Sequence, residues 1–99
     1  MFLYKDMKYY DTVRENIRKY RIEKNYTQSE LAEKSDLSVD YINEIESPTK
    51  NKTFSIRTVG RISEALEIEM YKLFIKSDVL SKNQWNYVII NMEMILCQN

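Results

Sequence analysis

Glycine and proline are almost missing from this chain of 99 residues, which contains one of each, Gly60 and Pro48. Sandwiches and barrels need many tight turns, and those turns depend on these two residue types. Helices joined by short connections need far fewer of them. Apolar residues make up 43% of the sequence, which is typical of a chain that folds around a core. We therefore expect a single all-α domain, since the chain is long enough for one core.

The residue types on which much enzyme chemistry depends are scarce. Histidine, the commonest general base and metal ligand, is absent. Cys97 is the only cysteine, so neither an intrachain disulfide nor a cysteine-based zinc site is possible. The sequence has no glycine-rich phosphate loop and no paired-carboxylate motif. We expect a protein that is not an enzyme, with no catalytic residues, no metal, no cofactor and no evident small-molecule ligand.

The apolar stretches are too short for a membrane span, because the longest contain only three or four residues. The N-terminal sequence carries charges inside what would have to be the apolar core of a signal peptide. We therefore expect no contact with a membrane and a cytoplasmic location.

Capping motifs place the first helices. Residues 1–11 are polar and aromatic without a clear period, so we expect an N-terminal arm there. Thr12 and Glu15 fit a capping box that begins a helix, and this helix should end near residues 24–25, since asparagine tolerates the left-handed conformation. Its inward stripe is expected to be Val13, Ile17 and Tyr20.

A second capping box, formed by Thr27 and Glu30, predicts a short helix over residues 28–35 with Leu31 and Ala32 facing inward. Asp36 interrupts the pattern. The next helix, over residues 38–46, begins at a natural N-cap, Ser38, and presents Ile42 and Ile45 to the core. It should stop before Pro48, because the residue before a proline disfavours the helical region.

The fourth helix is expected to begin after Ser55 and to carry an inward stripe of four residues. These four are Ile56, Val59, Ile62 and Leu66. Gly60 lies inside this helix, where we expect an exposed position; close packing against a neighbouring helix is the alternative. A brief fifth helix over residues 69–74 should close the core with Leu73 and Phe74.

The C-terminal extension, residues 76–99, differs in character. Ser81 and Gln84 fit a third capping box, followed by apolar residues at helical spacing, so we expect an additional helix over residues 82–97. A strand over residues 85–92 is the alternative. The apolar residues are Trp85, Val88, Ile89, Met92, Ile95 and Leu96. This stripe either packs back on its own domain or pairs with a second copy; we expect a homodimer, because the stripe would otherwise be exposed.

Two short helices over residues 28–35 and 38–46, with a tight turn between them, meet the requirements of a helix-turn-helix. In that motif the second helix enters the major groove of DNA and the first offers its amide groups to a phosphate. The positions that carry the pattern are Gln28, Leu31, Ala32, Asp36, Leu37, Ser38, Ile42, Ile45 and Glu46. This pattern resembles the Cro/repressor-type (XRE) helix-turn-helix family over residues 12–75. The resemblance implies a five-helix, lambda-repressor-like DNA-binding domain that acts as a dimer.

The resemblance also implies roles for particular residues. Gln28 would contact a phosphate, and an ion pair between Arg21 and Glu46 would tie the third helix to the first. The groove-facing positions would be Val39, Asp40, Asn43 and Glu44, beside Ser38 at the helix start. The residues that meet the DNA backbone would be Thr49, Lys50, Asn51 and Lys52. Asp36 and Asn25 replace glycines of the family, which is physically sensible because both residues tolerate positive φ.

The charge balance is unusual for a DNA-binding domain, because 15 basic residues face 15 acidic ones. Asp40 and Glu44 are acidic on the face expected to read DNA, although a carboxylate can accept from cytosine N4 and Val39 can meet a thymine methyl group. The cations expected to compensate are Arg14, Arg18, Lys19, Lys34, Lys50, Lys52, Arg57 and Arg61.

These observations predict a sequence-specific transcriptional regulator of duplex DNA, either a repressor or a self-regulating controller. The alternative is a helix-turn-helix scaffold used as a protein-protein interaction module, such as an antitoxin or an anti-repressor, with its acidic third helix facing the partner. DNA binding that weakens steeply with salt distinguishes the two.

Overall fold

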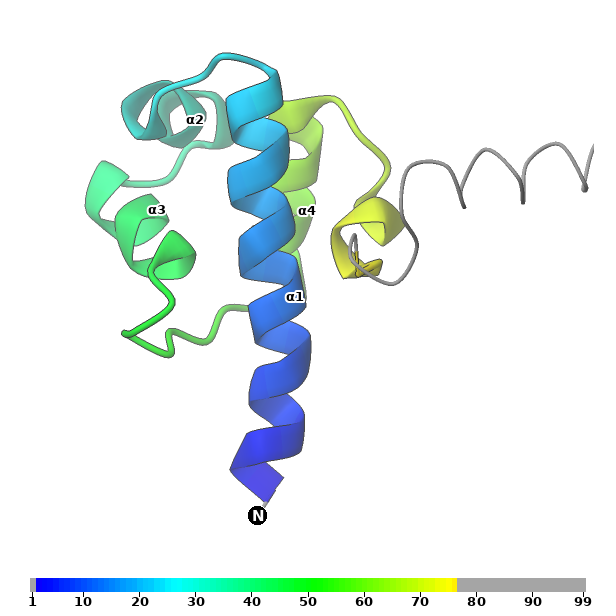
Figure 1. Ribbon diagram of the computed structural model, residues 1–99. Helices are drawn as coiled ribbons and strands as arrows, with labels where there is room; N and C mark the ends of the chain where they lie inside the picture. Colours follow the sequence, from blue (N-terminus) through cyan, green and yellow to red (C-terminus); the bar gives the residue numbers. More distant parts are fainter. Residues whose placement is uncertain (1, 77–99) are drawn as a thin grey trace, which may run out of the picture.

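The computed structural model describes the backbone of residues 2–76 and the side chains of residues 8–76, and this part of the chain is all-helical, without strands (Figure 1). It contains four α-helices and one short 3-10 helix. In chain order they are α1 (Phe2–Glu23), α2 (Gln28–Ser35), α3 (Val39–Glu46), α4 (Ile56–Leu66) and the 3-10 helix η1 (Met70–Phe74). The C-terminal helix expected over residues 82–97, its strand alternative and the expected dimerisation residues lie outside the described residues.

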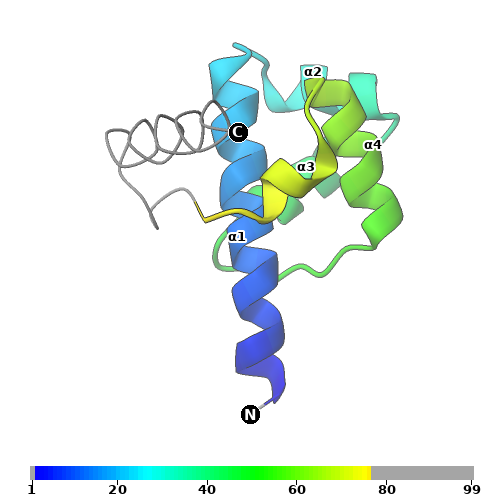
Figure 2. The ribbon, with the colours of Figure 1, turned by 90° about the vertical axis from the view of Figure 1, so that its right-hand side faces the viewer.

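The first helix is longer than the sequence pattern indicates, so the expectation of a loose arm over residues 1–11 is wrong for residues 2–11. α1 begins at Phe2, and its first turns extend beyond the other helices (Figures 1 and 2). Thr12 does not cap the helix; its hydroxyl donates back to the carbonyl oxygen of Lys8 (3.2 Å), as threonines do inside helices. No glycine or proline interrupts residues 2–11, and extending an existing helix costs much less than nucleating one.

The predicted caps of the next three helices are confirmed. Thr27 Oγ1 accepts from the Glu30 backbone N–H (3.0 Å), and Glu30 Oε1 accepts from the Thr27 backbone N–H (2.9 Å). This second hydrogen bond lowers the pKa of the exposed Glu30 carboxyl group, because it favours the carboxylate form. Ser38 and Ser55 cap α3 and α4 in the same way, each accepting from the third residue beyond it.

Most of the predicted core is buried. The buried apolar residues are Val13, Ile17, Leu31, Ala32, Ile42, Ile45, Phe54, Val59, Ile62, Leu66 and Leu73. The prediction of a buried side chain is wrong at two positions, since Ile56 is 64% exposed and Phe74 is 45% exposed. Phe54, which the sequence pattern leaves in a loop, is buried beside the start of α4, where Ile56 was expected to face inward.

The 3-10 geometry of η1 explains the exposure of Phe74. Side chains three residues apart eclipse one another in such a helix, so Met70 and Leu73 face the core together and Phe74 turns away. Gly60 of α4 lies close to this helix: a Cβ atom added there would lie 3.2 Å from Met70 Cε. Close packing, the alternative expectation for Gly60, is therefore the one that the structure supports.

No helix within residues 2–76 combines the length and the apolar character that a membrane crossing requires.

Candidate nucleic-acid interface

The α2–turn–α3 unit has the form of a helix-turn-helix. Asp36 ends α2 in the left-handed conformation (φ 58°), and the Leu37 N–H donates to the carbonyl oxygen of Ala32 (2.9 Å). Leu37 packs against the core, which makes it the apolar plug of the turn. With Ser38 capping α3, the orientation of the two helices is determined by hydrogen bonds and burial on both sides of the turn.

One face of α3 is open to solvent. Ile42 and Ile45 are buried, whereas Val39 is 42% exposed and Asp40 and Asn43 are exposed. Because neighbouring positions on a helix face are three or four residues apart, Val39, Asn43 and the half-buried Glu44 lie on one stretch of surface with Asp40. The groove-facing positions inferred from the resemblance are therefore together on this surface.

The predicted ion pair between Arg21 and Glu46 is present. Arg21 Nε donates to Glu46 Oε2 (2.7 Å) and Arg21 Nη2 to Glu46 Oε1 (2.9 Å), which is a bidentate arrangement. The third contact of the guanidinium runs from Nη1 to the carbonyl oxygen of Tyr26 (2.8 Å). Glu46 is 6% exposed, so this pair holds α3 against α1 from inside the fold.

Gln28 extends that ion pair to the surface. Its Nε2 donates to Glu46 Oε1 (3.1 Å), and its Oε1 accepts from Asn43 Nδ2 (3.1 Å). We call Arg21, Glu46, Gln28 and Asn43 the polar chain. Gln28 does not lie free at the start of α2; its amide is oriented by a buried carboxylate and in turn orients the exposed amide of Asn43. This role within the fold is one that the sequence pattern did not indicate.

The acidic residue Glu44 has a counter-ion within its own domain. Lys52 Nζ lies 3.3 Å from Glu44 Oε2 and 5.7 Å from the centre of the Tyr41 ring. Both partners of the ion pair are more than a third exposed, and such pairs contribute little net stability. The ammonium group of Lys52 can therefore leave Glu44 at small cost when a stronger anion is present.

The polar loop after α3 is attached to α1 by a buried arginine. Arg14 is 2% exposed; its Nε donates to the carbonyl oxygen of Ile45 (3.2 Å), its Nη2 to that of Lys52 (3.1 Å), and it pairs with the Asp11 carboxylate. The expectation that Arg14 compensates the acidic surface is therefore wrong. A sequence signal existed, since Arg14 and Arg21 flank Ile17 at helical spacing and so lie on the buried face of α1.

The loop leaves the other expected backbone-binding residues exposed. Thr49, Lys50 and Asn51 are exposed, and Asn51 adopts a positive φ of 50°. Thr49 Oγ1 lies within hydrogen-bond distance of Ser47 Oγ (3.2 Å). Lys50 and Lys52 thus lie in the loop that directly follows α3. In the part of the chain that the structure describes, no group of three or more acidic or cysteine side chains is arranged to hold a metal ion.

Comparisons with known proteins agree with this geometry. A family model described as "Helix-turn-helix" matches residues 17–73, more than half of the chain. The restriction-modification controller protein C.Esp1396I, solved bound to a 25 base pair operator site, is 31% identical with a TM-score of 0.63; the match covers 72% of this chain and 95% of that one. No curated protein matches the sequence.

Two further solved structures are similar. SinR in the SinR–SinI complex is 27% identical with a TM-score of 0.62, and the match covers 82% of this chain and 78% of that one. A hypothetical transcription factor, NHTF from Neisseria, has a TM-score of 0.65 at 23% identity, with 71% of this chain and 78% of that one covered. At that identity the second similarity concerns the fold alone.

Proposed function

Because this chain belongs to the XRE-type helix-turn-helix family, we propose that it is a sequence-specific regulator of transcription that binds duplex DNA. Within that role it acts as a repressor or as a controller of its own expression. The observation that carries the proposal is the α2–turn–α3 unit, in which the polar chain joins the buried Arg21–Glu46 pair to the exposed Asn43.

In the proposed complex α3 lies in the major groove, which is wide enough to admit a helix. The residues proposed to face the DNA bases are Val39, Asp40, Asn43 and Glu44, with Ser38 at the helix start. An asparagine amide matches the N6 and N7 edge of adenine, and a carboxylate can accept from cytosine N4. Asn43 is prepared for such a contact, because its hydrogen bond to Gln28 orients its amide before DNA binds.

The phosphate contacts are proposed at both ends of this unit. The N-terminus of α2, where Gln28 is the first residue, offers backbone N–H groups of the kind that bind anions. The loop after α3 supplies Thr49, Lys50, Asn51 and Lys52. Lys52 exchanges Glu44 for a phosphate in this proposal, since its exposed ion pair is weak and screened by salt.

The proposed assembly is a homodimer. Two copies related by a two-fold axis would place their α3 helices in successive major grooves, about 34 Å apart. The apolar residues of the C-terminal extension are the proposed dimerisation element. They are Trp85, Val88, Ile89, Met92, Ile95 and Leu96.

The experiment that tests the function is a selection from random duplex DNA, followed by fluorescence anisotropy with the selected and scrambled sequences. A regulator enriches one sequence, and its affinity falls steeply as salt rises because phosphate contacts release counter-ions. The DNA upstream of its own coding sequence is a second probe, which tests self-regulation. If no sequence is enriched and binding to every duplex is negligible at low salt, the proposal is wrong.

The acidic character of α3 supports a second candidate, a protein-protein interaction module such as an antitoxin or an anti-repressor. The solvent-facing side of the helix carries Asp40 and Glu44, whereas Glu46 is buried, and the helix contains no lysine or arginine. An acidic surface repels phosphates and suits a basic protein partner. Absence of salt-sensitive DNA binding, together with loss of partner binding on Asp40→Asn, would favour this candidate over the first.

A further inference from the structure

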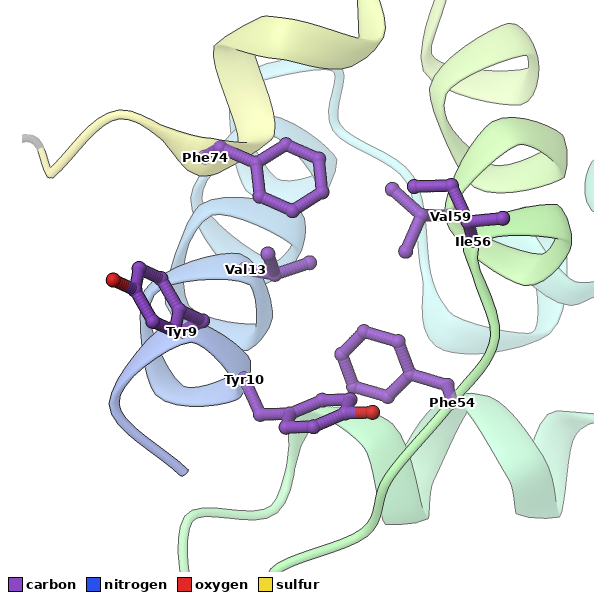
Figure 3. Close-up of a pocket in the computed structure, with 7 residues that line it drawn as sticks. All are labelled: Tyr9, Tyr10, Val13, Phe54, Ile56, Val59 and Phe74. Carbon is purple, nitrogen blue, oxygen red and sulfur yellow. The ribbon is translucent and has the colours of Figure 1, made fainter. Parts of the chain in front are cut away.

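An open apolar groove lies away from α3, where α1, the loop before α4, α4 and η1 meet (Figure 3). It has a volume of about 190 Å³. Its lining residues are Tyr9, Tyr10, Val13, Phe54, Ile56, Val59 and Phe74. None of these side chains carries a charge at neutral pH and most are apolar, so apolar burial is the main interaction that the groove offers.

Core packing and hydrogen bonds from α1 hold the residues of the groove in place. Val13 and Val59 are buried, and the rings of Tyr10 and Phe54 meet edge to face with their centres 5.0 Å apart. Asn16 Nδ2 donates to the carbonyl oxygens of Leu73 and Ile75, both at 2.8 Å, so the end of η1 is attached to α1 beside the groove. The geometry therefore needs no rearrangement before an apolar partner enters.

The walls of the groove are exposed to a degree that is unusual for large apolar side chains. Tyr9 is 68%, Ile56 64% and Phe74 45% exposed, and Ile75, the next residue after η1, is 38% exposed. These residues account for four of the seven large hydrophobic side chains that are exposed among those described. Apolar surface gathered in one place is characteristic of an interaction site rather than of a solvated face.

The position of the chain end indicates the occupant. Phe74 lines the groove, and the described chain ends two residues later, at Lys76. Residues 77–99 follow, and they include the six apolar residues of the proposed dimerisation element at helical spacing. Residues 85–96 of this segment are mostly apolar, as the groove is, and the two are connected through a short stretch of chain.

We infer that the groove of each subunit binds residues 85–96 of a second copy of this chain, an inference that rests on the homodimer of the proposed function and names its docking surface. A two-fold pair that exchanges these segments forms the same contact twice in one association step. The doubled apolar area offsets the loss of translational freedom, which a single groove-sized contact does not. A helix that lays an apolar face into such a groove is a recurrent mode of recognition.

Trp85 provides the test, because it is the only tryptophan in the chain and lies in the proposed docking segment. Light scattering gives the mass of the full chain over a concentration series, and Trp85 emission reports whether its ring is shielded from water. The groove variant is Ile56→Glu. Ile56 is exposed and is the first residue of α4, where an acidic side chain suits the helix dipole, so the fold is retained.

The matched control is Ile22→Glu, which makes the same substitution at a 48% exposed site on α1 outside the groove. Ile89→Glu places the charge on the segment instead. Ile56→Glu and Ile89→Glu should each weaken dimerisation about tenfold or more and shift Trp85 emission to longer wavelength, because a charge buried in an apolar contact is costly. Ile22→Glu should change neither quantity, and circular dichroism should show unchanged helix content for all three.

Two results would overturn the inference. A monomer whose Trp85 is shielded at every concentration would show that the segment covers its own groove. A dimer unaffected by Ile56→Glu would place the interface elsewhere. Binding of the Ile56→Glu variant to half of the operator, the part that one subunit would contact, separates this inference from the proposed function. If a monomeric variant keeps salt-sensitive binding to this half-site, the DNA-binding role stands, whatever the result of the dimer test.

Discussion

The guanidinium group of Arg14 donates to the carbonyl oxygen of Lys52 (3.1 Å) across 38 residues of sequence. This contact joins the buried face of α1 to the loop that carries the proposed phosphate-binding residues. The same side chain donates to the carbonyl oxygen of Ile45 at the end of α3. A residue that the sequence presents as one more surface cation thus determines where the loop after α3 lies.

Arg14→Ala should lower the free energy of unfolding by about 2–3 kcal/mol, because two backbone carbonyl groups lose a charged donor inside the fold. Urea denaturation measures the change. Arg18→Ala is the matched control, since Arg18 is an exposed arginine on the same helix, and it should stay within about 0.5 kcal/mol of the parent. Equal effects of the two substitutions would contradict the anchoring role of Arg14.

Glu46→Ala should destabilise the fold by about 3 kcal/mol or more, because it leaves the Arg21 guanidinium largely buried without its carboxylate partner. Glu44→Ala removes a carboxylate of the same helix whose ion pair is exposed, and its cost should remain below about 1 kcal/mol. Thermal or urea unfolding of both variants gives the comparison. A small effect at Glu46 would show that the bidentate pair contributes less than its burial indicates.

Gln28→Ala and Asn43→Ala should differ in their effects on DNA. The first removes the side chain that the family resemblance assigns to a phosphate contact and also releases Asn43, so affinity should fall for every sequence. The second should mainly reduce discrimination at one base pair, by about 1–3 kcal/mol. Anisotropy with the selected operator and its single-base variants measures both. If Asn43→Ala weakened all operators equally, Asn43 would not be a base-reading residue.

Glu44→Gln should raise affinity for all duplexes, because it removes a negative charge near the phosphates and frees Lys52. Lys52→Ala should lower affinity for all duplexes and reduce the salt slope by about one. The measurement is anisotropy over a series of salt concentrations. Weaker binding by Glu44→Gln would instead identify the carboxylate as a direct contact, for example to cytosine N4.

Gly60→Ala should raise the free energy of unfolding by up to about 1 kcal/mol, since alanine is the better helix former. The added methyl group would lie 3.2 Å from Met70 Cε, the far end of a flexible side chain that can move aside. Gly60→Val, which adds more bulk at the same place, should be destabilising. Urea denaturation separates the cases, and a loss of stability with alanine would mean that Met70 is held rigidly.

Much of the fold follows from signals that act within a few residues. The caps at Thr27, Ser38 and Ser55 and the positive φ angles of Asn25 and Asp36 were predictable, because each depends on a side chain and backbone atoms at most four residues away. The extent of α1 was not, since Thr12 and Glu15 imitate a capping box inside the helix, which propagates through residues 2–11 without a glycine or proline to stop it.

The candidate site also has features that were predictable from the sequence and features that were not. The family pattern and the helical period together predicted the exposed face of α3 and the pairing of Arg21 with Glu46. The state of each side chain on that surface was decided by the tertiary structure: Gln28 is held by Glu46, Glu44 is paired with Lys52, and Arg14 is buried.

By itself, then, the sequence determined the helices from α2 to α4, the turn between α2 and α3, and most of the core, because helix period and caps are local properties. Only the tertiary structure decided the partners of Arg14, Gln28 and Glu44, that Phe54 rather than Ile56 fills the core, and that an apolar groove remains open beside Phe74. Those outcomes depend on which distant segments come within a few ångströms of one another, and no local pattern encodes that distance.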